Sequence, residues 1–390
     1  MSTFQCRSYA HPICGKAAFR TRRSNQCPNL YLGKKKMTHL WLRAEQRANE
    51  QRVALTPKGA QHLKNMGMNI TVEACEKRCF SVDDYARAGC KIADHASWPG
   101  APRDAFILGL KELPQSKEAL LHRHIMFGHA YKGQHAGQGL LNRFKPGGGL
   151  LLDLEYLVDT KNRRVAAFGY WAGYAGAAVA LKCWAAQERG EICQKLDAYQ
   201  NNQALLNDLR QTLSGVKMAP PTGLVIGALG RVGAGVSDLC DALGLKITKW
   251  DLDDTAGRAE FPQILQHSIL FNCILAQPGA PVFLDKASVA QPRLLRVVAD
   301  IACDPDSDYN PLPIYTQATD WDKPAQRIAK TPVLDVMAID NLPSLLPRES
   351  SEDFAQQLRP YLEQLLAENS DENSVWSRAE TTYRHHIAQL

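Results

Sequence analysis

A glycine-rich turn between an apolar strand and a helix constrains the fold of this chain more than any other feature of its sequence. Residues 224–226 are apolar, and Gly227, Gly230 and Gly233 follow at three-residue spacing. Glycines so placed permit a tight turn, a close approach of backbone to a pyrophosphate, and contact between helix and strand. The pattern therefore predicts a dinucleotide-binding βα unit; the alternative is a turn that serves packing alone.

An acidic residue ends the next predicted strand, Ile247–Trp250. Asp251 lies 18 residues after Gly233, where an acid accepts a hydrogen bond from a ribose 2′-hydroxyl and repels a 2′-phosphate. This position favours NAD over NADP as the cofactor.

Strand and helix patterns alternate along the chain in two series. Strands are expected at 39–43, 69–74, 106–110, 125–130 and 150–154, and again at 224–226, 247–250, 269–273 and 295–299. Small residues between 166 and 178 predict a smooth helix that can approach another backbone closely. A linker is expected at 187–217, loops at 304–347, and amphipathic helices at 352–368 and 374–390. Repeated βα units indicate an α/β fold with mostly parallel sheets.

The charge of the chain is concentrated at its start. The 390 residues carry a net +6, but residues 1–36 hold eight Lys and Arg and no acid. The remaining residues are therefore slightly acidic, and nothing in them indicates a nucleic-acid partner. The basic leader is expected to be disordered or not native: it resembles a transit peptide loosely, and the favoured hypothesis is that Met37 is the true start.

Composition gives no indication of a metal or a membrane. No stretch approaches the roughly 18–20 apolar residues of a membrane helix. Eleven cysteines in a chain of this size indicate free thiols and a reducing cytoplasm rather than a disulfide scaffold. Cys75 and Cys79 lack a second ligand pair at zinc-finger spacing, and the histidines between 122 and 135 lack a matching carboxylate, so no metal is expected.

Polar side chains follow two of the expected buried strands. Lys111 and Glu112 come after one strand and His129 after the next, so both groups are expected at the same edge of a parallel sheet. A buried lysine and a histidine are suited to proton transfer near neutral pH. Without further information, a surface lysine and a hydrogen-bonded core histidine are the stronger alternative.

Several arginines are placed to bind carboxylates. Arg47 and Arg52 precede a predicted helix, and Arg163 and Arg164 precede the Gly- and Ala-rich segment. Guanidinium groups bind carboxylates through two parallel hydrogen bonds. The alternative is that these arginines are solvated on the surface.

Taken together, these motifs resemble the NAD-dependent, lysine-forming saccharopine dehydrogenases from about residue 40 to the end of the chain. The stretches that carry the resemblance are 42–45, 52–57, 101–104, 109–112, 128–132, 163–169, 226–231, 249–251 and, the longest, 339–349. The resemblance implies two Rossmann-like domains with the active site in the cleft between them. The substrate or catalytic domain would span 37–167 plus 342–390, and the NAD-binding domain 168–341.

The resemblance also implies an activity and a set of site residues. Saccharopine would be oxidised with NAD to lysine and 2-oxoglutarate, a step of lysine biosynthesis, with Lys111 and His129 transferring protons and Glu112 tuning Lys111. The matched substrate-binding positions are Arg52, Lys111, Lys132, Gln134, Arg164 and Phe168. The matched cofactor positions are Arg163, Gly227, Gly230, Arg231, Gly233, Asp251, Thr255 and Asp340.

Two departures from the family pattern stand out. Some relatives pair two cysteines near the cofactor; here Cys273 matches one and Val232 replaces the other, so that disulfide is not expected. Arg47 stands where relatives can have lysine.

The alternative functions are those of an alanine dehydrogenase-like enzyme, which shares the architecture, and of a non-catalytic NAD-binding sensor. The expected partner is a small-molecule substrate, and a monomer or a small homo-oligomer is expected.

Overall fold

The chain forms two six-stranded β-sheets in a computed structural model that describes residues 37–390 except 48, 132–134, 275–276, 368–370 and 372. The strands of the first sheet are β1 His39–Leu42, β2 Asn69–Glu73, β3 Lys91–Ala93, β4 Phe106–Leu108, β5 Arg123–Met126 and β6 Leu150–Asp153. Their order is β3-β2-β1-β4-β5-β6, and all neighbouring pairs are parallel. The predicted α/β class with two Rossmann-like domains is confirmed, whereas the expectations for residues 1–36 fall outside the described part.

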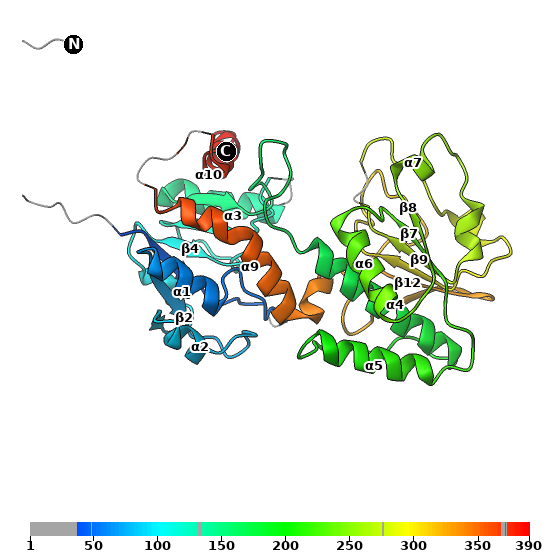
Figure 1. Ribbon diagram of the computed structural model, residues 1–390. Helices are drawn as coiled ribbons and strands as arrows, with labels where there is room; N and C mark the ends of the chain where they lie inside the picture. The colour runs from blue at the N-terminus through cyan, green and yellow to red at the C-terminus, as the bar shows by residue number, and fades with distance from the viewer. Residues whose placement is uncertain (1–36, 48, 132–134, 275–276, 368–370, 372) are drawn as a thin grey trace, which may run out of the picture. The chain divides into compact units, whose positions relative to one another are not determined.

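Helices from both ends of the described chain cover this sheet. They are α1 Pro57–Asn65, α2 Val82–Arg87, α3 His135–Gly147, α9 Pro347–Gln364 and α10 Val375–Ile387, with a 3₁₀ turn at Trp98–Gly100. Thr56 caps α1 by accepting from the Gly59 N–H, and Ser81 caps α2 in a capping box with Asp84. Figure 1 shows orange α9 and red α10 beside the blue and cyan elements of the first sheet.

Both faces of the first sheet are buried, as expected for parallel strands. Leu40 and Leu42 of β1 pack into one apolar cluster together with Phe354 and Leu358 of α9. Trp41, between them, packs into a second cluster on the opposite face. This alternation follows from the two-residue period of a strand.

The second sheet holds the glycine-rich turn. Its strands are β7 Gly223–Ile226, β8 Ile247–Trp250, β9 Ile269–Asn272, β10 Val297–Asp300, β11 Gln326–Lys330 and β12 Val333–Met337, in the order β11-β12-β10-β9-β7-β8. Only the pair formed by β11 and β12 is antiparallel among the described strand pairs. Its helices are α4 Gly169–Glu188, α5 Asn202–Ser214, α6 Arg231–Ala242, α7 Leu252–Thr255 and α8 Lys286–Val289, with 3₁₀ turns at Pro262–Gln266 and Leu342–Leu345.

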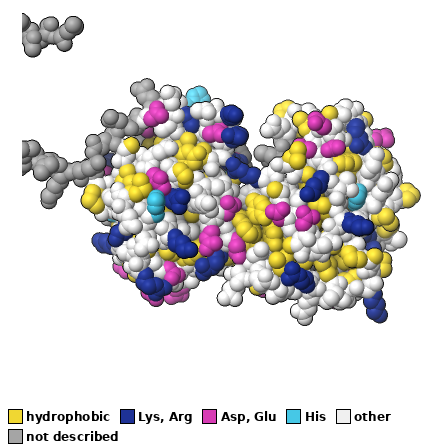
Figure 2. All heavy atoms as spheres, viewed as in Figure 1, with side chains coloured by type: hydrophobic (Ala, Val, Ile, Leu, Met, Phe, Trp, Pro, Cys, Tyr) yellow, Lys and Arg dark blue, Asp and Glu magenta, His cyan; other side chains and the backbone are white. Residues whose placement is uncertain are grey.

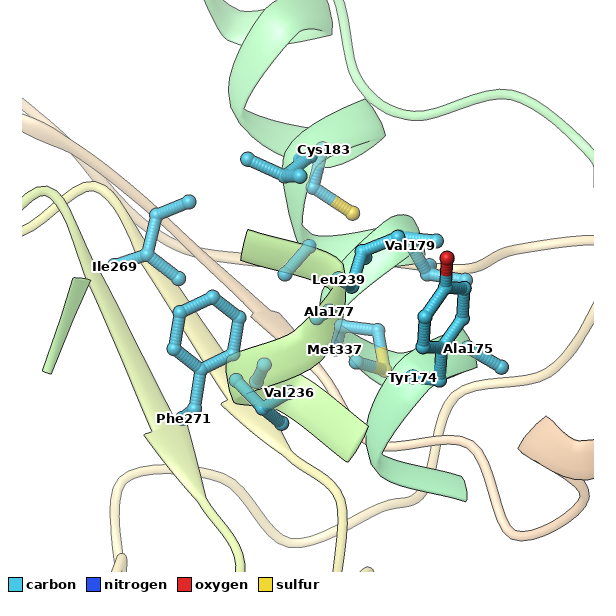
Figure 3. Packing of buried hydrophobic residues seen from close by; sticks show 14 of the residues in the cluster. Tyr174, Ala175, Ala177, Val179, Cys183, Val236, Leu239, Ile269, Phe271 and Met337 are labelled. Carbon is cyan, nitrogen blue, oxygen red and sulfur yellow. The ribbon is translucent and has the colours of Figure 1, made fainter. Parts of the chain in front are cut away.

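Glycines allow α4 and α6 to pack backbone to backbone. A Cβ on Gly173 of α4 would lie 1.8 Å from the Val232 carbonyl oxygen, and one on Gly235 of α6 would lie 1.9 Å from that of Tyr170. Side chains from α4, α6 and β9 meet in one cluster beneath this crossing (Figure 3). The predicted close approach of the small-residue helix is confirmed.

Two sequence-based expectations for the second half were wrong. The expected linker at 187–217 contains α5, which Asn201 caps and whose Leu205 and Leu209 are buried. The expected loops at 304–347 contain β11 and β12, which extend the sheet beside β10. In the first half, β3 and α3 were not foreseen, and the strand expected at 125–130 occupies Arg123–Met126.

The strand order places a ligand site at a defined edge of each sheet. In the first sheet the chain proceeds outward from β1 through β2, then crosses to β4 on the other side. In the second sheet β8 and β9 flank β7 in the same way. Ligands in open α/β sheets bind beyond the carboxyl ends of strands at such reversal points.

Candidate active site

Lys111 lies just beyond the carboxyl end of β4, at the reversal point of the first sheet. Its backbone is held by the buried Glu45, whose carboxylate accepts from the N–H of Leu110 at 2.7 Å and of Lys111 at 3.0 Å. The guanidinium of the buried Arg43 donates to the Lys111 carbonyl. Two residues that follow β1 therefore hold the backbone around Lys111 in place.

The surroundings of the Lys111 amine favour its neutral form. Burial lowers the pKa of Lys111, and the positive charge of Arg52 lowers it further. The carboxylates of Asp340 and Glu50 act in the opposite direction, with smaller effects. An amine whose pKa is lowered can accept a proton nearer to neutral pH.

Glu112 and His129, which follow neighbouring strands, line one cavity. The cavity has a volume of about 860 Å³ and is also lined by Arg47 and Arg143. The Arg47 guanidinium forms an ion pair with Glu112. Burial alone would raise the pKa of Glu112, but the Arg47 hydrogen bond and charge outweigh burial and lower it. Lys111, which was expected at the same edge of the sheet as His129, does not line this cavity.

His129 is held in an uncommon backbone conformation next to a carboxylate. Its φ is +47°, in the left-handed region that non-glycine residues rarely adopt. The Nδ1 atom lies 3.5 Å from Oε2 of Glu155, and Oε1 of the same carboxylate accepts from Arg164 at 3.1 Å. Sequence reasoning missed Glu155, although its place just after β6 is the same signal that indicated Lys111 and His129.

Arg52 is buried and already paired. Its guanidinium donates to both oxygens of the buried Glu50, at 2.8 and 2.7 Å, and to Asn341 Oδ1 at 2.6 Å. The same group lies 4.4 Å from the ring centroid of Phe168, which stacks on Phe354. The structure thus brings Arg52 and Phe168 into contact, but the Arg52 guanidinium that was expected to bind a substrate carboxylate already pairs with Glu50. Sequence reasoning missed Glu50 and Asn341.

The remaining predicted residues around the substrate differ in their settings. Arg163 is exposed and bonds to Asp159 at 2.9 Å, away from the groups above. Arg164 is half-exposed, and its carbonyl accepts from Arg231 at 3.3 Å. Lys132 and Gln134 lie outside the described residues.

The glycine-rich turn has the geometry that its spacing predicted. Gly227 has a φ of +81°, and a Cβ there would lie 2.6 Å from Ile274. A Cβ on Gly233 would lie 2.3 Å from the Gly227 carbonyl oxygen, and Gly230 is the N-cap of α6. Glycine is therefore required at 227 and 233, and the turn leads directly into a helix N-terminus.

Asp251 lies against this turn. One oxygen of its carboxylate accepts from the Leu229 N–H and the other from the Leu252 N–H, both at 2.9 Å. Thr255 is buried, and its hydroxyl lies 3.2 Å from the Leu252 carbonyl, within its own short helix. The glycine turn and an acid fixed beside it fit the pyrophosphate and ribose of a dinucleotide.

The described part of the chain shows free thiols and mixed surface charge. Eight cysteines are resolved as free, including Cys273, which packs with Val232 in the same cluster. Among the described residues, no group of three or more His, Cys, Asp or Glu could hold a metal, and none of the helices could span a membrane. Basic and acidic side chains are interspersed on the face shown in Figure 2.

Comparison with known proteins identifies the family. The chain is 43% identical over 366 residues to a protein from Candida glabrata named saccharopine dehydrogenase [NAD(+), L-lysine-forming], covering 90% of this chain and 97% of that protein. A protein of the same name from Schizosaccharomyces pombe is 40% identical, with 99% of its length covered. The chain belongs to the saccharopine dehydrogenase family. The resemblance predicted from the motifs is thereby confirmed.

The saccharopine dehydrogenase family shares its fold with other dehydrogenases. Residues 41–175 match the family model "Alanine dehydrogenase/PNT, N-terminal domain". An L-alanine dehydrogenase structure aligns with a TM-score of 0.62 at 16% identity, covering 84% of this chain and 90% of its own. A transhydrogenase from Sinorhizobium meliloti aligns with a TM-score of 0.60 at 15% identity, covering 87% and 97%. These two similarities establish the fold alone.

Proposed function

We propose that this protein is the NAD-dependent, lysine-forming saccharopine dehydrogenase, which converts saccharopine to lysine and 2-oxoglutarate reversibly. The observation that carries the proposal is the match with relatives of this name over nearly their whole length. The half-buried Lys111 and the turn around Gly227 would supply the two parts that the chemistry requires, a base and a dinucleotide site.

The cofactor site would be formed by Gly227, Gly230 and Gly233 against the pyrophosphate and by Asp251 against the adenosine ribose. Arg231 and Asp340 would line the same site, and Arg163 and Thr255 complete the predicted set. When bound, NAD accepts a hydride from the carbon that bears the secondary amine of saccharopine. The protein contributes orientation and electrostatics to that transfer.

Lys111 would take the proton of the secondary amine, because its neutral form is favoured by burial and by Arg52. Glu112, held by Arg47, would adjust the charge around Lys111. His129 would move protons to and from water during hydrolysis of the resulting imine, with Glu155 beside its Nδ1.

Substrate recognition would rest on cations, because saccharopine carries three carboxylates. Arg52 is held rigidly by Glu50, Asn341 and the ring of Phe168. Arg164 is half-exposed beside Glu155. These groups lie near the carboxyl edge of the first sheet, and Lys132 and Gln134, which are outside the described residues, would complete the proposed substrate site.

The decisive experiment compares substrates on the purified protein. We expect NADH to form with saccharopine and not with alanine, and to form with NAD in preference to NADP. Turnover of alanine without saccharopine would replace the proposal with an alanine dehydrogenase. NAD binding without turnover of either substrate would indicate a non-catalytic sensor.

We further propose the domain boundaries predicted from the sequence, 37–167 with 342–390 and 168–341. Packing of α9 and α10 against the first sheet supports this division.

A cytoplasmic location is proposed as well, supported by the free thiols of the eight described cysteines. A monomer or a small homo-oligomer remains the prediction for the assembly.

A further inference from the structure

A buried carboxylate lies directly behind His129. Asp153, the last residue of β6, has 1% of its surface exposed. Its Oδ2 accepts from the Gly128 N–H at 3.2 Å, and its Oδ1 accepts from the Glu155 N–H at 2.9 Å. One carboxylate therefore holds the backbone on both sides of the contact between His129 and Glu155.

This arrangement matters because His129 needs support from its surroundings. A non-glycine residue at a φ of +47° is disfavoured by about 1–3 kcal/mol and persists only where neighbouring structure enforces it. Gly128 immediately precedes His129, and its N–H is fixed by Asp153. Glu155, whose Oε2 lies 3.5 Å from His129 Nδ1, is fixed by the other oxygen of the same side chain.

We propose that Asp153 is a positioning residue that holds His129 and Glu155 in the relative position that proton transfer requires. The inference rests on the proposed function, since it assigns a role in the reaction of the same site. Asp153 does not line the cavity shared by Glu112 and His129, and it acts through the backbone of the two segments that it joins.

The charge of Asp153 adds to its effect on geometry. Burial raises the pKa of the Asp153 carboxyl to about 6, with the charge of Glu155 contributing and that of His129 opposing. Tyr131 faces the same carboxylate; its ring lies 5.0 Å from Tyr156 and 4.5 Å from His386. Asp153 therefore gains its charge in the pH range where a histidine titrates.

The test compares Asp153→Asn and Gly128→Ala with the unmodified protein. The amide keeps one acceptor oxygen but turns an N–H donor toward one of the two backbone N–H groups. An alanine Cβ at 128 would lie 2.8 Å from Leu151 and 3.2 Å from Asp153 Oδ2, so it disturbs the same contact without removing the carboxylate. Asp335→Asn, at a fully buried carboxylate in β12 that pairs with Arg327, is the control for a general loss of stability.

We expect kcat for saccharopine to fall on the order of 10- to 100-fold in both test variants, with KM for NAD unchanged. In Asp153→Asn the pH profile of kcat should also change around pH 6, because the carboxyl group whose pKa is about 6 is gone. Asp335→Asn should lower the melting temperature without moving the profile. Unchanged kcat and pH profiles in both test variants, or a parallel loss of NAD binding, would overturn the inference. Failure of the unmodified protein to oxidise saccharopine would instead refute the proposed function.

Discussion

Lys111 combines features that a surface lysine lacks. Its backbone is fixed by Glu45, and its half-buried side chain lies within the electrostatic influence of Arg52. Lys111→Met should lower kcat by about 100- to 10,000-fold, the range typical of a lost acid–base group. NAD binding, measured by fluorescence titration, should be spared.

The matched control for this substitution is Lys91→Met, at an exposed lysine on β3. We expect it to behave like the unmodified protein. Full turnover in Lys111→Met would remove Lys111 from the mechanism.

The raised pKa of Asp153 also predicts how the free energy of unfolding varies with pH. Its pKa is raised to about 6 in the folded protein, from 3.8 for an unburied aspartate. The protonated carboxyl therefore favours the fold at low pH, and this contribution is lost as the pH rises through about 6. The free energy of unfolding of Asp153→Asn, relative to the unmodified protein, should rise by about 2 kcal/mol between pH 4 and 7. Urea unfolding at several pH values measures this difference, and a constant difference would contradict it.

At the scale of elements, the crossing of α4 and α6 fixes the helix that follows the glycine-rich turn. A Cβ at Gly173 would meet a backbone oxygen, Val232 O, at 1.8 Å, and a backbone atom cannot rotate away. Gly173→Ala should therefore lower the free energy of unfolding by at least about 1–3 kcal/mol. Weaker NAD binding should accompany the loss, because α6 begins at the turn.

Gly139→Ala provides the comparison for a glycine in a helix. A Cβ at Gly139 of α3 meets nothing within 4 Å, so this change should stabilise the protein by up to about 1 kcal/mol. Chemical unfolding of both variants distinguishes the packing effect from helix propensity. Equal stability of the two variants would contradict the close approach of α4 and α6.

Elements with strong local signals were predicted well. The helix expected from the small residues at 166–178 corresponds to α4, and the strands expected at 224–226 and 247–250 correspond to β7 and β8. By contrast, α5 was taken for a linker because its segment is polar, although Leu205, Leu206 and Leu209 are buried. Strands β11 and β12 were missed because they are short and lie among prolines and aspartates, so that no alternation of apolar and polar residues marks them in the sequence. They form because neighbouring strands pair with them.

At the scale of the whole molecule, the C-terminal helices complete the first domain. Leu358 of α9 is fully buried in the cluster that contains Leu40 of β1. Leu358→Ala should lower the free energy of unfolding by about 2–5 kcal/mol, through lost burial and a cavity.

Leu294→Ala, at a leucine that is 66% exposed, is the control and should change the free energy of unfolding by no more than about 0.5 kcal/mol. Thermal and urea unfolding check both variants. A similar effect of the two changes would show that α9 contributes little to this core.

The sequence by itself determined the family, the α/β class, the glycine-rich turn with Asp251, and the placing of Lys111, Glu112 and His129 after strands. These features depend on residues close together in the chain, where spacing and local geometry are coupled. Only the tertiary structure decided which polar groups meet: Arg52 bonds to Glu50 and Asn341, and Glu155 pairs with His129 and Arg164. Asp153 holds the backbone of Gly128 and Glu155 beside the second group. The partners of most of these contacts come from different strands or turns, so strand order and register, rather than distance along the chain, bring them together.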